Sequence, residues 1–156
     1  MNSQRLTFIR HAHASSSIVD ITRPLSPEGL AQAQHRAASL KDQDFDLIII
    51  SAALRTRQTA EIILEAQSHK APIEEVLELY IAPDRENSTV EEILEIISSR
   101  ISKHNAKNIL IVGHANIINE LGHLRLPSDT ELLMKPFKPA EGFCIEEDDR
   151  LIMIQN

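Results

Sequence analysis

Short runs of apolar residues alternate along this chain with longer stretches whose apolar positions recur every three or four residues. Short continuous apolar runs bounded by polar residues are typical of buried β-strands. The runs predict strands at residues 6–9, 47–50, 76–79 and 109–112, with a weaker pair at residues 143–145 and 151–154.

Four helices are predicted between these strands. Ser26 followed by Pro27 is a favourable helix start, because serine caps the first turn and proline suits the first helical position. Ser88 and Glu91 have the spacing of a capping box for the third helix. The apolar positions that mark the four helices are Leu30, Ala33, Ala37 and Leu40; Ala60, Ile63 and Leu64; Ile93, Ile97 and Ile101; and Ile117, Ile118 and Leu121.

Strands that alternate with helices predict an α/β fold with a mostly parallel central sheet. In such sheets, ligands bind beyond the carboxyl ends of the strands. The 156 residues suit one domain, and no repeat or linker interrupts it. We therefore expect a single domain over residues 1–156, with the polar stretch at 82–88 as a loop inside it.

Composition excludes several classes of protein. The net charge of −7 gives no general attraction to nucleic acid or anionic membranes, and 3% aromatic residues leave little for base stacking. A single cysteine, Cys144, allows no intrachain disulfide. No secretory signal or long apolar span is visible, so we expect a cytoplasmic protein.

Cationic and imidazole side chains follow three of the predicted strands. A parallel sheet would gather them at one edge, and a cluster of arginine and histidine is suited to a doubly charged anion. The residues at these strand ends are Arg10, His11 and His13; Ser51 and Arg55; and Gly113 and His114.

Each of these residues has an ordinary structural interpretation when taken alone. Arg10 suits a surface position at a strand end, an isolated His11 is usually a hydrogen-bonded structural histidine, and Gly113 can serve a turn. The coincidence across three strands favours the functional interpretation.

Three segments together resemble the signature of the histidine phosphatase superfamily, the phosphoglycerate-mutase-like group. The matching text is FIRHAHA at 8–14, SAALRTRQTA at 51–60 and ILIVGHANII at 109–118. The resemblance implies a three-layer sandwich in which helices flank the central sheet. Ala12 stands where the broad family has glycine. The small size and the text DITRPLSPEGLAQAQ at 20–34 are similar to the short branch of SixA-type phosphohistidine phosphatases.

The resemblance also implies the mechanism. His11 would attack phosphorus and become phosphohistidine, which water would then hydrolyse. Arg10, Arg55 and His114 would hold the phosphoryl oxygens and stabilise their charge during transfer. The other nitrogen of His11 needs a partner, such as a backbone carbonyl, to set its tautomer.

Three further residues are candidates for the site. His13 follows His11 closely, and Arg57 lies two residues beyond Arg55, so both are candidate substrate contacts. Glu78 is the candidate general acid, with Asp84 and Glu86 as alternatives, and an exposed structural carboxylate is an equal interpretation of Glu78. A phosphohistidine phosphatase is thought to need no strong acid, because imidazole leaves more readily than an alkoxide.

Other functions are weighed against this hypothesis. His11 and His13 have the spacing of a zinc-binding pair in barrel amidohydrolases, but that fold needs about 250 residues. A non-catalytic phospho-ligand module would use arginines without needing a central imidazole. A mutase would need more covering structure. Cys144 and Arg150 match a cysteine phosphatase loop in spacing, but the four acidic residues between them would repel phosphate.

The sequence therefore predicts a phosphatase without metal or cofactor. The favoured substrate is a protein phosphohistidine, and the alternative is a small phosphomonoester such as a sugar or nucleotide phosphate. Residues 127–141 are expected to cover the edge of the site or to form an interface. The sequence shows neither the oligomeric state nor the substrate.

Overall fold

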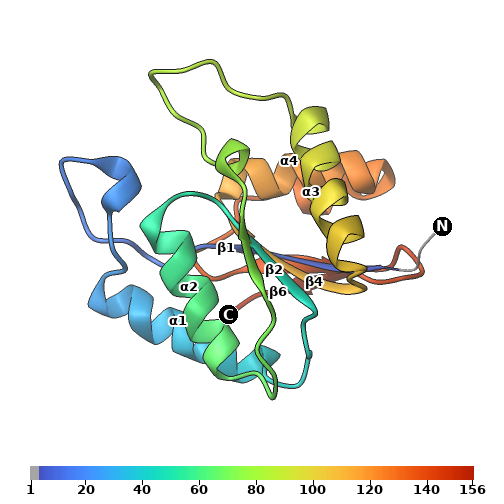
Figure 1. Cartoon of the computed structure of the whole chain (residues 1–156), viewed down its shortest axis with the longest axis horizontal. Coiled ribbons are helices and arrows are strands. Elements are labelled where there is room, and N and C mark those ends of the chain that lie inside the picture. Colours follow the sequence, from blue (N-terminus) through green and yellow to red (C-terminus); the bar gives the residue numbers. More distant parts are fainter. Residues whose placement is uncertain (1–3) are drawn as a thin grey trace.

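The computed structural model describes residues 4–156 and contains one six-stranded sheet in the order β3-β2-β4-β1-β5-β6 (Figure 1). The first four strands of this order are parallel, and β5 is antiparallel to both of its neighbours. A mostly parallel sheet is thus confirmed. The strands are β1 (Arg5–Arg10), β2 (Leu47–Ile50), β3 (Ile73–Glu75), β4 (Asn108–Gly113), β5 (Gly142–Ile145) and β6 (Leu151–Ile154).

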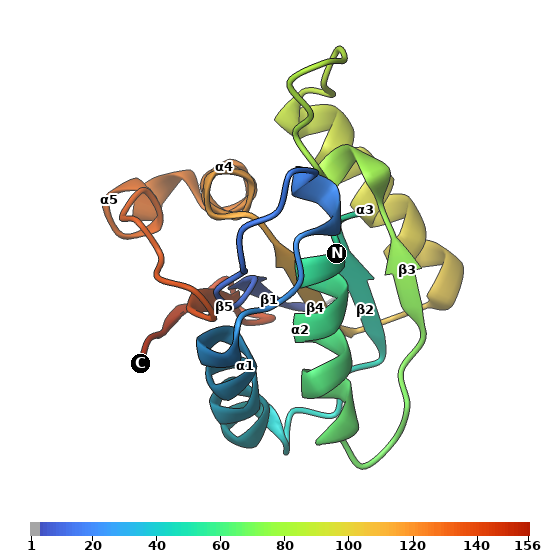
Figure 2. The same cartoon turned by 90° about the vertical axis from the view of Figure 1, so that its left-hand side faces the viewer.

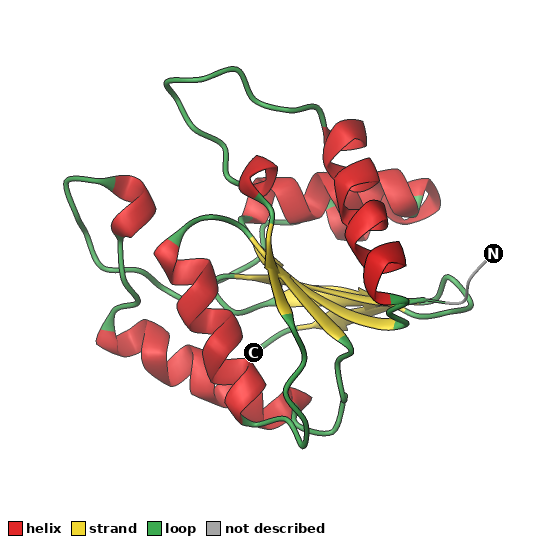
Figure 3. Cartoon of the chain, viewed as in Figure 1, coloured by secondary structure: helices red, strands yellow, loops and turns green. Residues whose placement is uncertain are grey.

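Helices cover both faces of the sheet, which makes the three layers visible in Figures 1 and 3. One face carries α1 (Pro27–Leu40) and α2 (Leu54–Glu65). The other carries α3 (Val90–His104) and α4 (Ala115–Arg125), and the short α5 (Thr130–Leu133) lies against α4. The predicted α/β sandwich is confirmed, and each predicted helix is present.

Alternating strand residues build a separate core on each face. In β4, Ile109 and Ile111 pack in the cluster under α3 and α4, whereas Leu110 and Val112 pack in the cluster under α1 and α2. All four side chains are fully buried. A strand buried on both sides needs an unbroken apolar run, which is why these strands were readable from the sequence.

The starts of α1 and α3 follow capping chemistry, with one correction. Ser26 caps α1 as predicted, accepting the Gly29 N–H at 3.0 Å. The capping box of α3 uses Thr89 and Glu92, not Ser88 and Glu91. The two pairs have the same spacing, and Thr89 is the residue whose extended backbone places its hydroxyl over the first turn.

The predicted strand at residues 76–79 is wrong. The strand β3 lies just before it, and the run itself forms a single 3-10 turn, η2 (Leu77–Leu79). The strand β3 pairs with β2, which ends at Ile50, and the Ile50 carbonyl accepts the Val76 N–H. Beyond Val76, this segment therefore has no neighbouring strand residues of β2 to pair with. The turn buries Leu79 but leaves Leu77 exposed.

The remaining connections are loops, and residues 82–88 contain no helix or strand, as predicted. Within residues 4–156, no helix has the length and apolar character needed to cross a membrane.

Candidate functional site

The carboxyl ends of three neighbouring strands form the site. In the order β2-β4-β1, Ile50 pairs with Val112 and Gly113 pairs with Arg10, so the three strands end side by side. The His11 N–H donates to the Gly113 carbonyl at 2.9 Å. Figure 2 shows α2 and α4 beside this part of the sheet, and both helices begin directly after their strands.

The four predicted catalytic side chains come together at this edge. The Nε of Arg55 lies 3.3 Å from the Nε2 of His11. The rings of His11 and His114 have centroids 5.2 Å apart and meet at 66°. Arg10 is near enough for its charge to lower the pKa of both imidazoles. The cluster therefore combines two guanidinium groups with two imidazoles.

Hydrogen bonding sets the tautomer of His11. Its Nδ1 lies 2.7 Å from the Ala12 carbonyl oxygen, which can only accept, so the proton is on Nδ1. The Nε2 lone pair is then free to accept from Arg55. A backbone carbonyl is thus the partner that the sequence analysis required. Ala12, the residue that supplies this carbonyl, is fully buried beside Leu25 and Ala33.

The environment also keeps both imidazoles neutral. Burial lowers the pKa of His11 to about 4, and the charges of Arg55, Arg10 and Arg23 act in the same direction, against the Ala12 hydrogen bond. The pKa of His114 is lowered to about 3, mainly by burial, and the charges of His11 and Arg55 act in the same direction. A neutral His11 is nucleophilic at neutral pH.

We expect the His11 ring to titrate near pH 4 instead of at its ordinary 6.5, measured by NMR of the ring carbons and assigned with His11→Asn. Because the unfolded chain takes up protons at His11 and His114 first, stability should fall as the pH drops from about 6.5 towards 4. A midpoint near 6.5 for His11 would contradict the buried, arginine-flanked setting.

Asp20 completes the surroundings of Arg55 and was missed by the sequence analysis as an individual residue. It lies in the 3-10 helix η1 (Asp20–Thr22), and its backbone oxygen and carboxylate accept from Arg55 at 2.8 and 3.1 Å. The Tyr80 hydroxyl donates to the same carboxylate at 2.8 Å. Partial burial would raise the pKa of Asp20, but the bonds from Tyr80, Arg23 and Arg55 outweigh it and lower the pKa to about 2.

Two hydroxyls of the second sequence segment hold the histidines. The Ser51 hydroxyl shares a 2.9 Å hydrogen bond with Nε2 of His114. Thr59 accepts the Ala12 N–H at 3.1 Å and so holds the turn after His11. The spacing of serine, arginine and threonine in this segment therefore has one physical basis. Ser51 directly follows β2, and the first turns of α2 bring Arg55 and Thr59 to the same edge of the sheet.

Arg10 links the site to the chain's later part. Its Nη1 donates to the Phe137 carbonyl at 2.6 Å, and its own carbonyl accepts the Ala140 N–H at 3.1 Å. Phe137 and Ala140 thus lie against the edge of the site, whereas the earlier part of the segment 127–141 packs against α4.

The structure gives the other candidates different neighbours. His13 is exposed, and its Nδ1 lies 2.6 Å from the Ser26 hydroxyl at the start of α1. Arg57 pairs with Glu61 and Glu75 at 3.7 and 3.2 Å. Glu78 is partly buried in η2. Within residues 4–156, none of these three side chains forms a hydrogen bond or ion pair with the four clustered residues, so their roles stay predictions.

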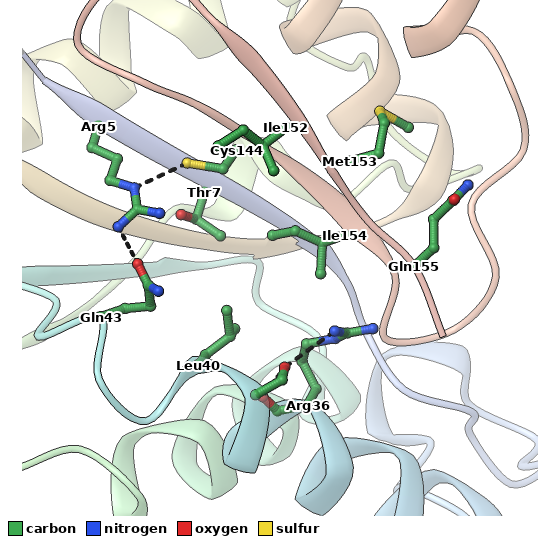
Figure 4. Close-up of a pocket in the computed structure, with 11 residues that line it drawn as sticks. Arg5, Thr7, Arg36, Leu40, Gln43, Cys144, Ile152, Met153, Ile154 and Gln155 are labelled. Carbon is green, nitrogen blue, oxygen red and sulfur yellow. Dashed lines mark hydrogen bonds between the residues drawn. The ribbon is translucent and has the colours of Figure 1, made fainter.

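Cys144 and Arg150 do not form a phosphate loop. Cys144 is buried in β5 beside a separate cavity of about 290 Å³, where Arg5 donates to its sulfur at 3.2 Å (Figure 4). The Nε of Arg150 lies 3.8 Å from Oδ2 of Asp148. This cavity shares no residue with the strand-end cluster.

The sequence over residues 6–95 matches the family described as the histidine phosphatase superfamily (branch 1). The chain belongs to this superfamily. It is therefore a phosphatase, a hydrolase that acts on phosphorylated substrates, as the sequence analysis predicted. No match was found among curated proteins.

Solved structures of the superfamily share the fold along nearly the whole chain. A protein of Agrobacterium tumefaciens provisionally assigned as the phosphohistidine phosphatase SixA has a TM-score of 0.80 at 24% identity, covering 98% of both chains. The alpha-ribazole phosphatase from Shigella flexneri has a TM-score of 0.76 at 18% identity, and the match covers 98% of this chain and 96% of that one. Phosphoglycerate mutase from Bacillus anthracis has a TM-score of 0.72 at 15% identity, and the match covers 98% of this chain and 92% of that one. The phosphoglycerate-mutase-like fold is confirmed.

Proposed function

We propose that this histidine phosphatase removes the phosphoryl group from protein phosphohistidine through a covalent intermediate on His11, within one domain of residues 1–156. The observation that carries the proposal is the state of His11, whose Nδ1 proton is held by Ala12 while Nε2 faces Arg55. A histidine held in this way is prepared for nucleophilic attack. The expectation that the protein acts in the cytoplasm stays a prediction.

The reaction takes two displacements. In the first, the Nε2 lone pair of His11 forms a bond to phosphorus as the bond to the leaving nitrogen breaks, and the leaving imidazole carries its own proton away. In the second, water attacks phosphorus, the bond to Nε2 breaks, and inorganic phosphate leaves while the water proton passes to solvent. The first step leaves His11 phosphorylated on Nε2 and still protonated on Nδ1, and the second step returns it to its neutral form.

Arg10, Arg55 and His114 stabilise the charge on the phosphoryl oxygens in both steps. Asp20 accepts from the two outer nitrogens of Arg55 and so holds the Arg55 Nε–H beside Nε2 of His11, from where this donor can turn to a phosphoryl oxygen when the Nε2 lone pair attacks phosphorus. Because the guanidinium is held before substrate arrives, little ordering is needed during transfer.

The carboxylates around the site favour a leaving group that departs without a strong acid. With its pKa lowered to about 2, Asp20 is ionised at neutral pH and has no proton to donate. Across the described residues 4–156, the Glu78 side chain forms no hydrogen bond or ion pair with Arg10, His11, Arg55 or His114. An imidazole leaves without such help more readily than an alkoxide, which supports a phosphoramidate substrate.

The alternative substrate is a small phosphomonoester, as for the alpha-ribazole phosphatase that shares the fold. Hydrolysis of an alkyl phosphate would require a proton donor, and Glu78 is the candidate. If the protein were instead a non-catalytic phospho-ligand module, it would bind phosphate compounds and hydrolyse none of them.

A substrate panel tests the proposal. We expect kcat/KM for a phosphohistidine peptide to exceed that for sugar and nucleoside phosphates by at least about tenfold, because no positioned acid assists the alkoxide. Glu78→Gln should leave phosphohistidine hydrolysis unchanged. A preference for an alkyl phosphate that is lost in Glu78→Gln would instead assign the small-molecule activity and its acid.

A further inference from the structure

A groove borders the catalytic cluster on the side of Tyr80. We call it the rim groove; it is lined by residues 18–21, 77, 80 and 82–85 and encloses about 530 Å³. Two chain segments form its walls, the loop with η1 and the stretch from η2 into the following loop, which lie next to each other in Figure 2.

The rim groove is continuous with the phosphate site through two shared side chains. Tyr80 lines the groove, and its ring lies 5.8 Å from that of His114, centroid to centroid. Asp20 lines the groove and holds Arg55. Whatever is covalently attached to a phosphoryl group bound by Arg55 and His114 can therefore extend into this groove.

Exposed apolar side chains stand on the walls of the rim groove beside the charged residues Asp20, Asp84 and Arg85. Ile18 is fully exposed, Val19 is 53% exposed and Leu77 is 48% exposed. Exposed apolar side chains gathered beside a functional site are typical of an interaction surface. The ionised Asp20 is already paired with Arg23 and Arg55, so it does not demand a cation from a ligand.

The walls are also held in place before any ligand arrives. Arg85 donates to the carbonyls of Leu77 and Tyr80 at 3.0 and 2.6 Å. Asn87 exchanges two 3.0 Å hydrogen bonds with the backbone of Ala82. A preformed surface loses little freedom on binding.

Resting on the proposed phosphohistidine activity, we propose that the rim groove binds an apolar side chain next to the phosphorylated histidine of a polypeptide substrate. A small ligand is enclosed by its pocket, whereas an extended polypeptide can cover the exposed Ile18 side chain while its phosphohistidine reaches Arg55 and His114. The groove is thus a specificity-determining surface that selects the sequence around the phosphohistidine.

Two synthetic peptides that differ only in leucine or serine beside the phosphohistidine, together with free phosphohistidine, test this proposal. Wild type should hydrolyse the leucine peptide with a kcat/KM about tenfold above the serine peptide, as expected for burying one apolar side chain. The double variant Ile18→Ser, Leu77→Ser should abolish this preference and leave free phosphohistidine unaffected. Leu124→Ser, an exposed leucine in the last turn of α4, is the matched control and should keep the preference.

The outcomes separate the two proposals. Equal hydrolysis of both peptides by wild type, or a preference that survives the double variant, would overturn the rim groove and leave the phosphohistidine activity standing. No hydrolysis of any phosphohistidine compound would overturn the proposed function itself. A nucleoside phosphate is assayed beside the peptides, and a loss in the double variant that is confined to this compound would assign the groove to a small molecule and overturn the polypeptide proposal. All variants should melt at the wild-type temperature, because the substituted side chains are exposed.

Discussion

Replacing His11 with alanine should reduce hydrolysis by roughly 10⁴–10⁶-fold, because the covalent route is lost together with its nucleophile. His11 accepts from Arg55 and donates to Ala12, and no other described side chain holds an unprotonated nitrogen in that position. Phosphate release from a phosphohistidine peptide measures the effect.

Trapping the intermediate distinguishes loss of the nucleophile from misfolding. Wild type quenched in mild alkali should carry phosphate on His11, identified by mass spectrometry, and His11→Ala should carry none. His35→Ala is a matched control, since that histidine is exposed on α1 away from the strand ends. Turnover that persists at the wild-type rate in His11→Ala would remove the proposed nucleophile.

Replacing Arg55 with alanine should lower kcat/KM by about 10³-fold, because a buried, preoriented guanidinium stabilises the charge of the transferring phosphoryl group. Arg55 is 5% exposed and is held by Asp20 on its outer side. Its removal also leaves Asp20 with fewer donors, but that carboxylate is half exposed and keeps Tyr80 and Arg23, so a stability loss of only about 1 kcal/mol or less should accompany the kinetic effect. Steady-state kinetics and urea unfolding measure the two effects separately.

Arg57→Ala provides the matched control on the same helix. Arg57 lies two residues further along α2, yet it pairs with Glu61 and Glu75 at the surface. Near-wild-type kinetics in Arg57→Ala would agree with that placement, and a loss as large as that of Arg55→Ala would show that Arg57 contacts the substrate after all. Arg55→Lys keeps the charge but loses the forked donors, and should recover only part of the activity.

Most of the sheet could be predicted because it depends on local pattern. The strands β2 and β4 are buried on both faces, so each is an unbroken apolar run. The run at residues 76–79 misled the analysis, because burial of Val76 and Leu79 by a 3-10 turn leaves the same apolar pattern as a short strand. Only the end of the partner strand β2 distinguishes the two.

The clustering of Arg10, His11, Arg55 and His114 was predictable for a related reason. Each follows a strand closely in sequence, and parallel neighbours in register place their carboxyl ends together. No long-range information beyond the parallel sheet was needed to bring these side chains to one edge. The roles of Ser51 and Thr59 were present in the same segment but required the path of α2 to become visible.

Periodicity and strand-end position are properties of short stretches, so the order of residues alone specifies the α/β class, the two-sided core and the sheet edge that gathers the candidate site residues. The contacts of Asp20 with Arg55 and Tyr80 join residues 35 and 60 positions apart, and they depend on the path that each loop takes through space. The same holds for His13 at the start of α1 and for the rim groove, whose walls come from two separate loops. Loop paths follow from the packing of the whole chain, and the local alternation of apolar and polar residues carries no record of them.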